Sequence, residues 1–179
     1  MRSVRRALLS VCLLALCACG PPEGERRELA LHFDGPKPSP VRVRGEQLFH
    51  DGDWIPDGDF VYYDKQGNVT HRGQFELGLE SGDWSQLSKD GVTGTGRYNL
   101  GERHGDWTYH YASKLVREEG SYDNGKRIGI WSRYYSDGSI EGKTPYVDGK
   151  IEGEVKVWDT SGKPDPESSG YFKNGERVR

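Results

Sequence analysis

One stretch of the chain decides its fold: Tyr122-Asp123-Asn124-Gly125-Lys126-Arg127-Ile128-Gly129-Ile130-Trp131. Asn-Gly between two runs that hold aromatic and β-branched residues is the strongest short-range signal of a β-hairpin. The stretch recurs, because glycines follow one another at spacings of 24, 23, 24 and 24 residues, at Gly58, Gly82, Gly105, Gly129 and Gly153. A second series, each member an aromatic residue with glycine three positions later, consists of Phe75, Tyr98, Tyr122, Tyr146 and Phe172. Two such series predict an array of supersecondary units.

Each copy is predicted to be strand, turn, strand, turn. In four copies a glycine, Gly67, Gly91, Gly138 or Gly162, lies seven residues after the residue of the first strand that is usually aromatic. Glycine adopts a positive φ without strain, so these glycines predict the turn that follows the first strand. The third copy has Lys114 there, so we expect its turn to differ. No stretch after the first 19 residues keeps a 3.6-residue apolar period, so we expect almost no helix. The predicted fold is all-β: an elongated antiparallel sheet, meander or solenoid-like, of about five to six hairpin repeats over residues 45–179.

The fourth copy departs from the pattern. Thr144-Pro145 replaces the expected glycine and its neighbour before Tyr146. Proline cannot donate to a ladder, so this strand is predicted to be irregular or unpaired on one side. Upstream, the half-copy Leu48-Phe49-His50-Asp51-Gly52-Asp53-Trp54 extends the array before Gly58.

The aromatic residues leave two alternatives open. The first strands hold Phe60, Trp84, Trp107 and Trp131, with Val155 in the fifth copy. Three residues after these positions come Tyr63, Leu87, His110, Tyr134 and Trp158. A flat strand places positions i and i+3 on opposite faces, so either both faces are partly aromatic or a bulge intervenes. We favour a structural layer that holds the array together. The alternative is a ligand or partner surface that stacks on sugar rings, formed by Trp84, Trp107, Trp131, Tyr134 and Trp158.

The N-terminus has the pattern of a secretory signal. Arg2, Arg5 and Arg6 precede an apolar stretch, residues 7–16, that is too short to span a bilayer. Leu16-Cys17-Ala18-Cys19 resembles a bacterial lipobox, which implies removal of residues 1–18 and lipid attachment at Cys19, with acyl chains such as palmitate. Gly20 after it implies, by resemblance to enterobacterial sorting, an outer-membrane location in the cell envelope.

Residues 19–44 are expected to be the lipidated cysteine and a Pro-rich spacer, because prolines occur at positions 21, 22, 36, 38 and 40. Residues 29–33 and 41–44 have strand character within it.

Charge and cysteine content exclude several functions. The formal net charge of −3 becomes −6 when residues 1–18, with three Arg and no acid, are removed. Such a surface repels phosphate backbones, so we expect no nucleic-acid partner and contact with the membrane through the anchor only. All three cysteines lie at or before position 19, which leaves no disulfide framework and no thiol nucleophile.

Catalytic and metal-binding patterns find no support, so we expect no enzyme, no cofactor and no metal. His104, Asp106 and His110 share strand parity, but a turn at Gly105 breaks the strand between them. His32, His50 and His71 are expected to be unclustered and solvated.

The quoted stretch and its counterpart at residues 98–107 resemble MORN-type repeats, in particular the bacterial variant of YwqK-family antitoxin components, over about residues 48–179. The resemblance implies a curled antiparallel sheet and a protein that binds and neutralises a toxin. A lipid-anchored protein outside the cytoplasm, however, does not meet a cytoplasmic toxin. We therefore predict a non-catalytic envelope lipoprotein that binds an unidentified protein as a scaffold or inhibitor. One alternative is an antitoxin or immunity-type protein, and another is a glycan or cell-wall binding module that uses the aromatic stripe.

Overall fold

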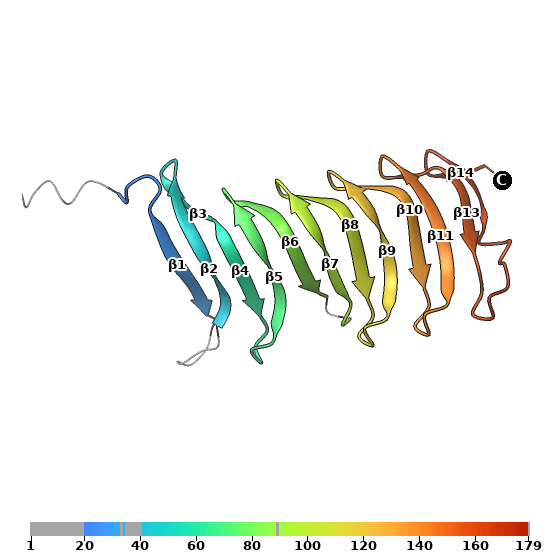
Figure 1. Ribbon diagram of the computed structural model, residues 1–179, viewed down its shortest axis with the longest axis horizontal. Helices are drawn as coiled ribbons and strands as arrows, with labels where there is room; N and C mark the ends of the chain where they lie inside the picture. The colour runs from blue at the N-terminus through green and yellow to red at the C-terminus, as the bar shows by residue number, and fades with distance from the viewer. Residues whose placement is uncertain (1–19, 33, 35–40, 89, 179) are drawn as a thin grey trace, which may run out of the picture.

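The computed structural model describes residues 20–32, 34, 41–88 and 90–178, so Cys19 and the signal segment lie outside the described residues. All its regular secondary structure is β-strand (Figure 1). The strands are β1 (Arg26–His32), β2 (Val41–His50), β3 (Asp53–Pro56), β4 (Gly58–Tyr63), β5 (Val69–Glu76), β6 (Leu79–Leu87), β7 (Thr93–Asn99), β8 (Glu102–His110), β9 (Val116–Asp123), β10 (Lys126–Tyr134), β11 (Ile140–Val147), β12 (Lys150–Ile151), β13 (Gly153–Val157), β14 (Gly170–Lys173) and β15 (Glu176–Arg177).

The strands form one open antiparallel sheet in meander order, so the predicted fold class is confirmed. The main path runs β1-β2-β4-β5-β6-β7-β8-β9-β10-β11-β13-β14-β15, with β3 on β2 and β12 on β11. The sheet begins at Arg26, because β1 pairs with β2 from Arg26–Leu48 to His32–Val41. The spacer prediction is therefore wrong for residues 26–32 and 41–44, where the strand character seen in the sequence prevails over the flanking prolines.

Two-residue turns line one edge of the sheet, the upper edge in Figure 1, which we call the tight-turn edge. Each turn pairs a non-glycine residue at positive φ with a glycine at positive φ, as type I′ hairpins require. The six turns are Asp51-Gly52, Leu77-Gly78, Leu100-Gly101, Asn124-Gly125, Asp148-Gly149 and Asn174-Gly175. The turn glycines also join neighbouring copies, as when the Gly125 N–H donates to the Arg103 carbonyl at 2.9 Å.

Longer turns line the opposite edge, and they share one hydrogen-bond pattern. In the fourth copy the Gly138 N–H donates to the Tyr135 carbonyl at 2.9 Å. The prediction that the third copy differs is wrong: the Lys114 N–H makes the same bond to the Tyr111 carbonyl at 2.8 Å, with Lys114 at φ 69°. The neighbouring copy holds this turn in place, because the Tyr111 hydroxyl donates to the Tyr134 carbonyl at 2.7 Å.

A repeated β-bulge positions the tryptophans. Arg97 pairs with His104 and Thr95 with Thr108, so the three residues 105–107 lie opposite the single residue Gly96. The Trp107 ring lies flat across that glycine, and a Cβ built on Gly96 would meet ring atoms at 2.3 Å. The Trp107 indole N–H donates to the Arg97 carbonyl at 3.0 Å. Trp84 and Trp131 repeat the arrangement over Gly73 and Gly120.

The bulges place a continuous series of rings on one side of the sheet, the aromatic face. Each ring contacts the next edge to face, from a centroid separation of 4.8 Å between Phe60 and Phe75 to 6.5 Å between Trp131 and Tyr146. The series is Phe60, Phe75, Trp84, Tyr98, Trp107, Tyr122, Trp131 and Tyr146. Edge-to-face pairs add to the stability that burial gives, so this face is the core of the array.

The series ends where the sequence pattern changes. Val155 takes the place of the ring in the fifth copy, and Thr144 takes the place of the glycine opposite it. The strand that pairs with β11 here is interrupted at Glu152, between β12 and β13, whereas β6, β8 and β10 are continuous. The irregularity predicted at Thr144-Pro145 is thus confirmed.

Candidate binding surfaces

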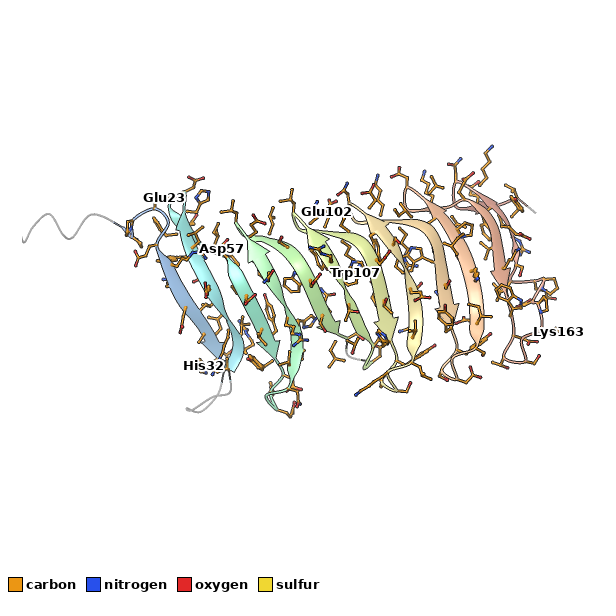
Figure 2. All side chains as sticks on the ribbon, viewed as in Figure 1. Glu23, His32, Asp57, Glu102, Trp107 and Lys163 are labelled. Atoms are coloured by element: carbon orange, nitrogen blue, oxygen red, sulfur yellow. The ribbon has the colours of Figure 1, made fainter. Side chains whose placement is uncertain are left out.

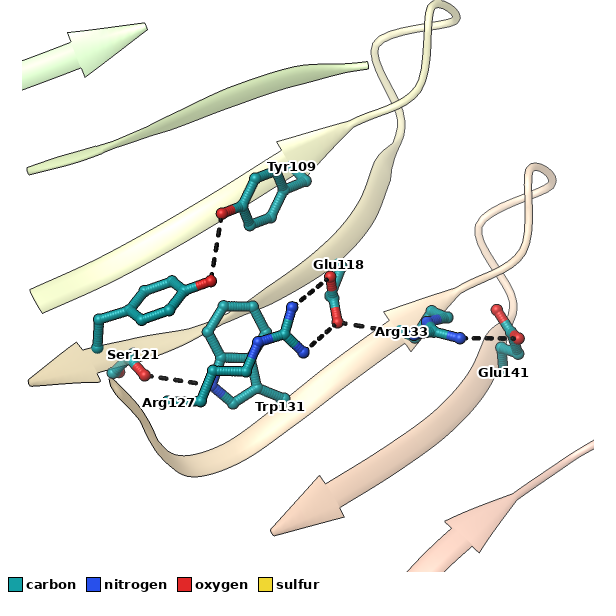
Figure 3. A network of polar contacts seen from close by, with 8 residues as sticks. Tyr109, Glu118, Ser121, Arg127, Trp131, Arg133 and Glu141 are labelled. Atoms are coloured by element: carbon teal, nitrogen blue, oxygen red, sulfur yellow. Dashed lines mark hydrogen bonds and ion pairs between the residues drawn. The ribbon is translucent and has the colours of Figure 1, made fainter. Parts of the chain in front are cut away.

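Charged side chains cover part of the aromatic face, as Figure 3 shows. The Arg127 guanidinium lies 3.8 Å from the centroid of Trp131 and makes two hydrogen bonds to Glu118, at 2.9 and 3.2 Å. Burial acts to lower the pKa of Arg127, but the hydrogen bonds to Glu118 outweigh it and raise the pKa, so the charge is permanent. Arg103 lies in the same way above Trp107, at 5.0 Å.

A hollow of about 90 Å³ lies beside this network, above Trp131. Its charged groups have partners of opposite charge, because Arg133 lies 3.8 Å from Glu118 and 3.7 Å from Glu141. Nearby, the Tyr109 and Tyr122 hydroxyls lie 3.4 Å apart, and burial together with this hydrogen bond raises the pKa of Tyr109. The network therefore holds the aromatic face together.

The opposite side of the sheet, the polar face, carries a trough. Three adjoining hollows of about 590, 360 and 450 Å³ share lining residues: Asp59 and Val61 belong to the first two, Arg72 and Asp83 to the last two. The trough crosses the strands from β1 to β8. Its floor follows one row of cross-strand partners, Arg44, Val61, Arg72, Ser85, Thr95 and Thr108.

Charged and polar groups form one wall of the trough. Asp83 and Arg97 lie opposite each other with 3.2 Å between Oδ1 and Nε, and Gln74 donates to Asp59 at 2.9 Å. Asp106 accepts from the Ser121 hydroxyl at 2.6 Å. Asp59, Asp83 and Asp106 are exposed, so this wall presents carboxylates to a ligand in the trough.

The five aromatic residues of the candidate surface do not lie together. Trp84, Trp107 and Trp131 are 4%, 0% and 2% exposed and form the core, so the structural interpretation is confirmed and a stacking surface made of these three is wrong. Tyr134 lies on the polar face, where its hydroxyl donates to Glu119 at 2.7 Å, a bond that raises its pKa. Trp158 is half-buried and bridges to Pro164. Both faces are thus aromatic, and the bulge is present as well.

The trough was not predicted from the sequence. Its floor depends on which residues become neighbours across six strands, and the bulges shift that register from copy to copy. One signal was present: a small hydroxylated residue, Ser85, Thr108 or Ser132, follows each of the three core tryptophans, whereas Lys156 follows Val155 in the fifth copy.

The histidines have specific partners. His104 lies 3.5 Å from Asp123, and Asp106 bonds Ser121, so the considered set of His104, Asp106 and His110 does not converge. The expectation that His50 is unclustered is wrong, because it lies with Glu23 and Asp51. The ligand atoms of these three residues all lie within 4.8 Å of one another, and in the described part of the chain no other group of three or more His, Cys, Asp or Glu residues does so. A hydrogen bond of 2.6 Å from the His50 ring to the Glu23 carboxylate, together with the charge of Asp51, raises the pKa of His50. This favours an ion pair over metal coordination, which needs a neutral imidazole.

The fold defines a hairpin-repeat protein with one closed face and one grooved face. Residues 127–148 match the family described as MORN repeat variant. The turns and bulges of the other copies resemble those of this matched copy, which is consistent with MORN-like repeats. No curated protein matches the chain. Among the described residues, no helix is long and apolar enough to cross a membrane.

Proposed function

We propose that this chain is a non-catalytic bacterial envelope lipoprotein, anchored through Cys19, whose repeat array binds a partner protein as a scaffold or inhibitor. The partner occupies the polar-face trough. Repeat arrays characteristically present extended binding surfaces of this kind, because each copy contributes one strip of the surface.

The trough is the observation that supports this proposal. It crosses seven strands, which at about 4.8 Å per strand gives a length of about 29 Å. An extended peptide segment of about nine residues has that length. From β6 to β8 the floor consists of the short side chains of Ser85, Thr95 and Thr108, which leave room for such a segment, whereas from β2 to β5 it carries Arg44, Val61 and Arg72. The carboxylate wall offers hydrogen-bond acceptors to the backbone of the segment and to basic side chains.

A glycan ligand has less support. Stacking on sugars needs exposed rings, and Trp84, Trp107 and Trp131 are core residues of the opposite face. An immunity-type role remains within the proposed class, because it differs only in which protein occupies the trough.

The test is affinity capture from detergent-solubilised envelope with the full chain, tagged after Arg179, and with Cys19→Ala to measure the role of the anchor. Ser85→Arg combined with Thr108→Arg fills the floor of the trough with two long side chains. Thr160→Arg is the control, because Thr160 is exposed in the last long turn and lies outside this row of cross-strand partners.

We expect one protein in near-equal stoichiometry, lost with the double variant and retained with the control. Equal capture of the partner by the double variant would show that the binding surface is not the trough. Retention on purified cell wall with no protein recovered would favour the glycan alternative instead.

A further inference from the structure

Two adjacent turns of the tight-turn edge carry leucine where the other turns carry Asn or Asp. Leu77 and Leu100 adopt φ values of 48° and 49°. They are also 55% and 64% exposed, and Leu79 beside them is 46% exposed. We call these three residues the leucine tips.

Folding alone does not favour leucine at these turns. A residue with a Cβ at positive φ is strained, and Asn or Asp tolerates this conformation better than leucine. An exposed leucine also leaves apolar surface in water. Two independent costs at neighbouring turns indicate that the leucine tips contact an apolar environment that is absent from the isolated chain.

The leucine tips lie on the same edge as the point where the chain enters the array. The Gly24 N–H donates to the Phe49 carbonyl at 2.9 Å, and Glu23 pairs with His50, the residue before the Asp51-Gly52 turn. A Cβ on Gly20 would lie 3.8 Å from the Phe49 ring. The described chain therefore begins, at Gly20, beside the tight-turn edge, in the upper left of Figure 1.

We infer that the tight-turn edge faces the membrane and that the leucine tips enter its interface. This inference rests on the proposed anchor at Cys19, which would hold the first tight turn at the bilayer surface. The array then lies along the membrane on this edge, with the longer turns pointing away from it.

Charge specifies the lipid surface. Glu76 precedes Leu77, Glu80 follows Leu79, and Glu102 lies two residues after Leu100 at the same edge (Figure 2). Carboxylates gain nothing at an anionic surface and are repelled by it, whereas burial of leucine in the interface does not depend on headgroup charge. The edge is therefore suited to a zwitterionic surface.

The test uses the full lipidated chain in phosphatidylcholine vesicles with an environment-sensitive dye on a single introduced thiol. Leu100→Cys places the dye among the leucine tips, and Ser113→Cys, in the third long turn, is the matched control on the other edge. Bromine-labelled lipid quenches the dye at position 100 about fivefold more strongly than at position 113 if the edge enters the interface. Addition of Leu77→Asn to the Leu100→Cys chain, or of phosphatidylglycerol to the vesicles, reduces that difference.

Flotation of the vesicles distinguishes failure of the proposed anchor from failure of the inferred orientation. A chain that does not float with the vesicles refutes the anchor, and with it the proposed membrane location. A chain that floats, but whose two dyes are quenched equally, refutes the orientation while the anchor stands. Unchanged quenching after Leu77→Asn would show that the leucine tips do not make the contact.

Discussion

The substitution Gly96→Ala should be among the most destabilising single changes in this protein, although it adds one methyl group. The added Cβ would lie 2.3 Å from Cδ2 and 2.4 Å from Cε2 of Trp107, far inside van der Waals contact. These are the rigid middle of the ring and not its flexible end, so the whole indole must move. Trp107 is fully buried and contacts the rings of Tyr98, Tyr109 and Tyr122.

The magnitude follows from what Trp107 loses. Displacement of a buried tryptophan approaches the cost of truncating it, about 3–5 kcal/mol. Removal of a glycine from a strand returns about 0.5–1 kcal/mol. We therefore expect Gly96→Ala to lower the free energy of unfolding by about 3 kcal/mol.

The fifth copy supplies the compensating change, since Thr144 there lies opposite the bulge that carries Val155. Trp107→Val alone should cost about 3–4 kcal/mol. Gly96→Ala in that background should cost little more, because no ring covers position 96. The double-mutant cycle should then give a coupling energy of about 2–3 kcal/mol.

The assay is urea unfolding followed by far-UV circular dichroism, with the m-value checked in each variant because arrays can unfold in parts. Gly142→Ala is the control, since its Cβ would lie 3.3 Å from the Lys156 carbonyl oxygen, a much milder contact than the one at Gly96. A Gly96→Ala chain within about 0.5 kcal/mol of the wild type, or strict additivity in the cycle, would refute the argument.

Three further changes test other parts of the array. Lys114→Gly should raise the free energy of unfolding by about 1 kcal/mol, since glycine adopts a φ of 69° without strain. Ser113→Gly, the control at the next residue, should not raise it, and the two variants are compared by thermal melting. Glu118→Gln should lower the free energy of unfolding in urea by about 1.5–3 kcal/mol, because Arg127 loses its charged partner. Glu154→Gln, the control, removes an exposed ion pair with Lys156 and should lower it by less than about 0.5 kcal/mol. The pKa of His50 should exceed 6.5 in an NMR titration and fall in Glu23→Gln. Because the pKa of His50 is raised in the folded state, its ion pair with Glu23 is complete below pH 6.5 and is lost as the pH rises through the folded pKa. Over that rise in pH, hydrogen exchange of the Gly24 amide should accelerate by more than its intrinsic pH dependence.

The repeat architecture could be predicted because its signals are local. Asn124-Gly125 specifies a tight hairpin whatever surrounds it, and the glycine spacing fixes the length of a copy. The same local logic predicted the wrong turn at Lys114. There the Tyr111 hydroxyl bonds the next copy, and the two backbone bonds of the turn hold Lys114 at positive φ despite its Cβ.

The binding surface could not be predicted, because it depends on register across many strands. The sequence places Gly105 and Trp107 two positions apart, but it does not show that residues 105–107 oppose Gly96 alone. That bulge directs Trp107 to the aromatic face and brings Thr95 beside Thr108 on the other. A one-residue error in register would exchange the two faces, so the core and the trough had to be located together.

Charge along the polar face also sets a direction for the bound segment. Beyond the trough, the row of cross-strand partners continues through Glu119 and Ser132 to Lys143 and Lys156. The carboxylate wall lies beside the first half of the row and the two lysines at its far end. The lining of the trough is acidic on balance, because it carries five carboxylates, on Glu28, Glu46, Asp59, Asp83 and Asp106, against three arginines, Arg44, Arg72 and Arg97. A segment with basic residues over the trough and acidic residues toward β13 matches this order better than the reversed segment does. Lys143→Glu combined with Lys156→Glu should therefore weaken partner binding in the capture experiment, and Lys150→Glu on the tight-turn edge should not. Equal effects of the two would show that only overall charge matters and that the row imposes no direction.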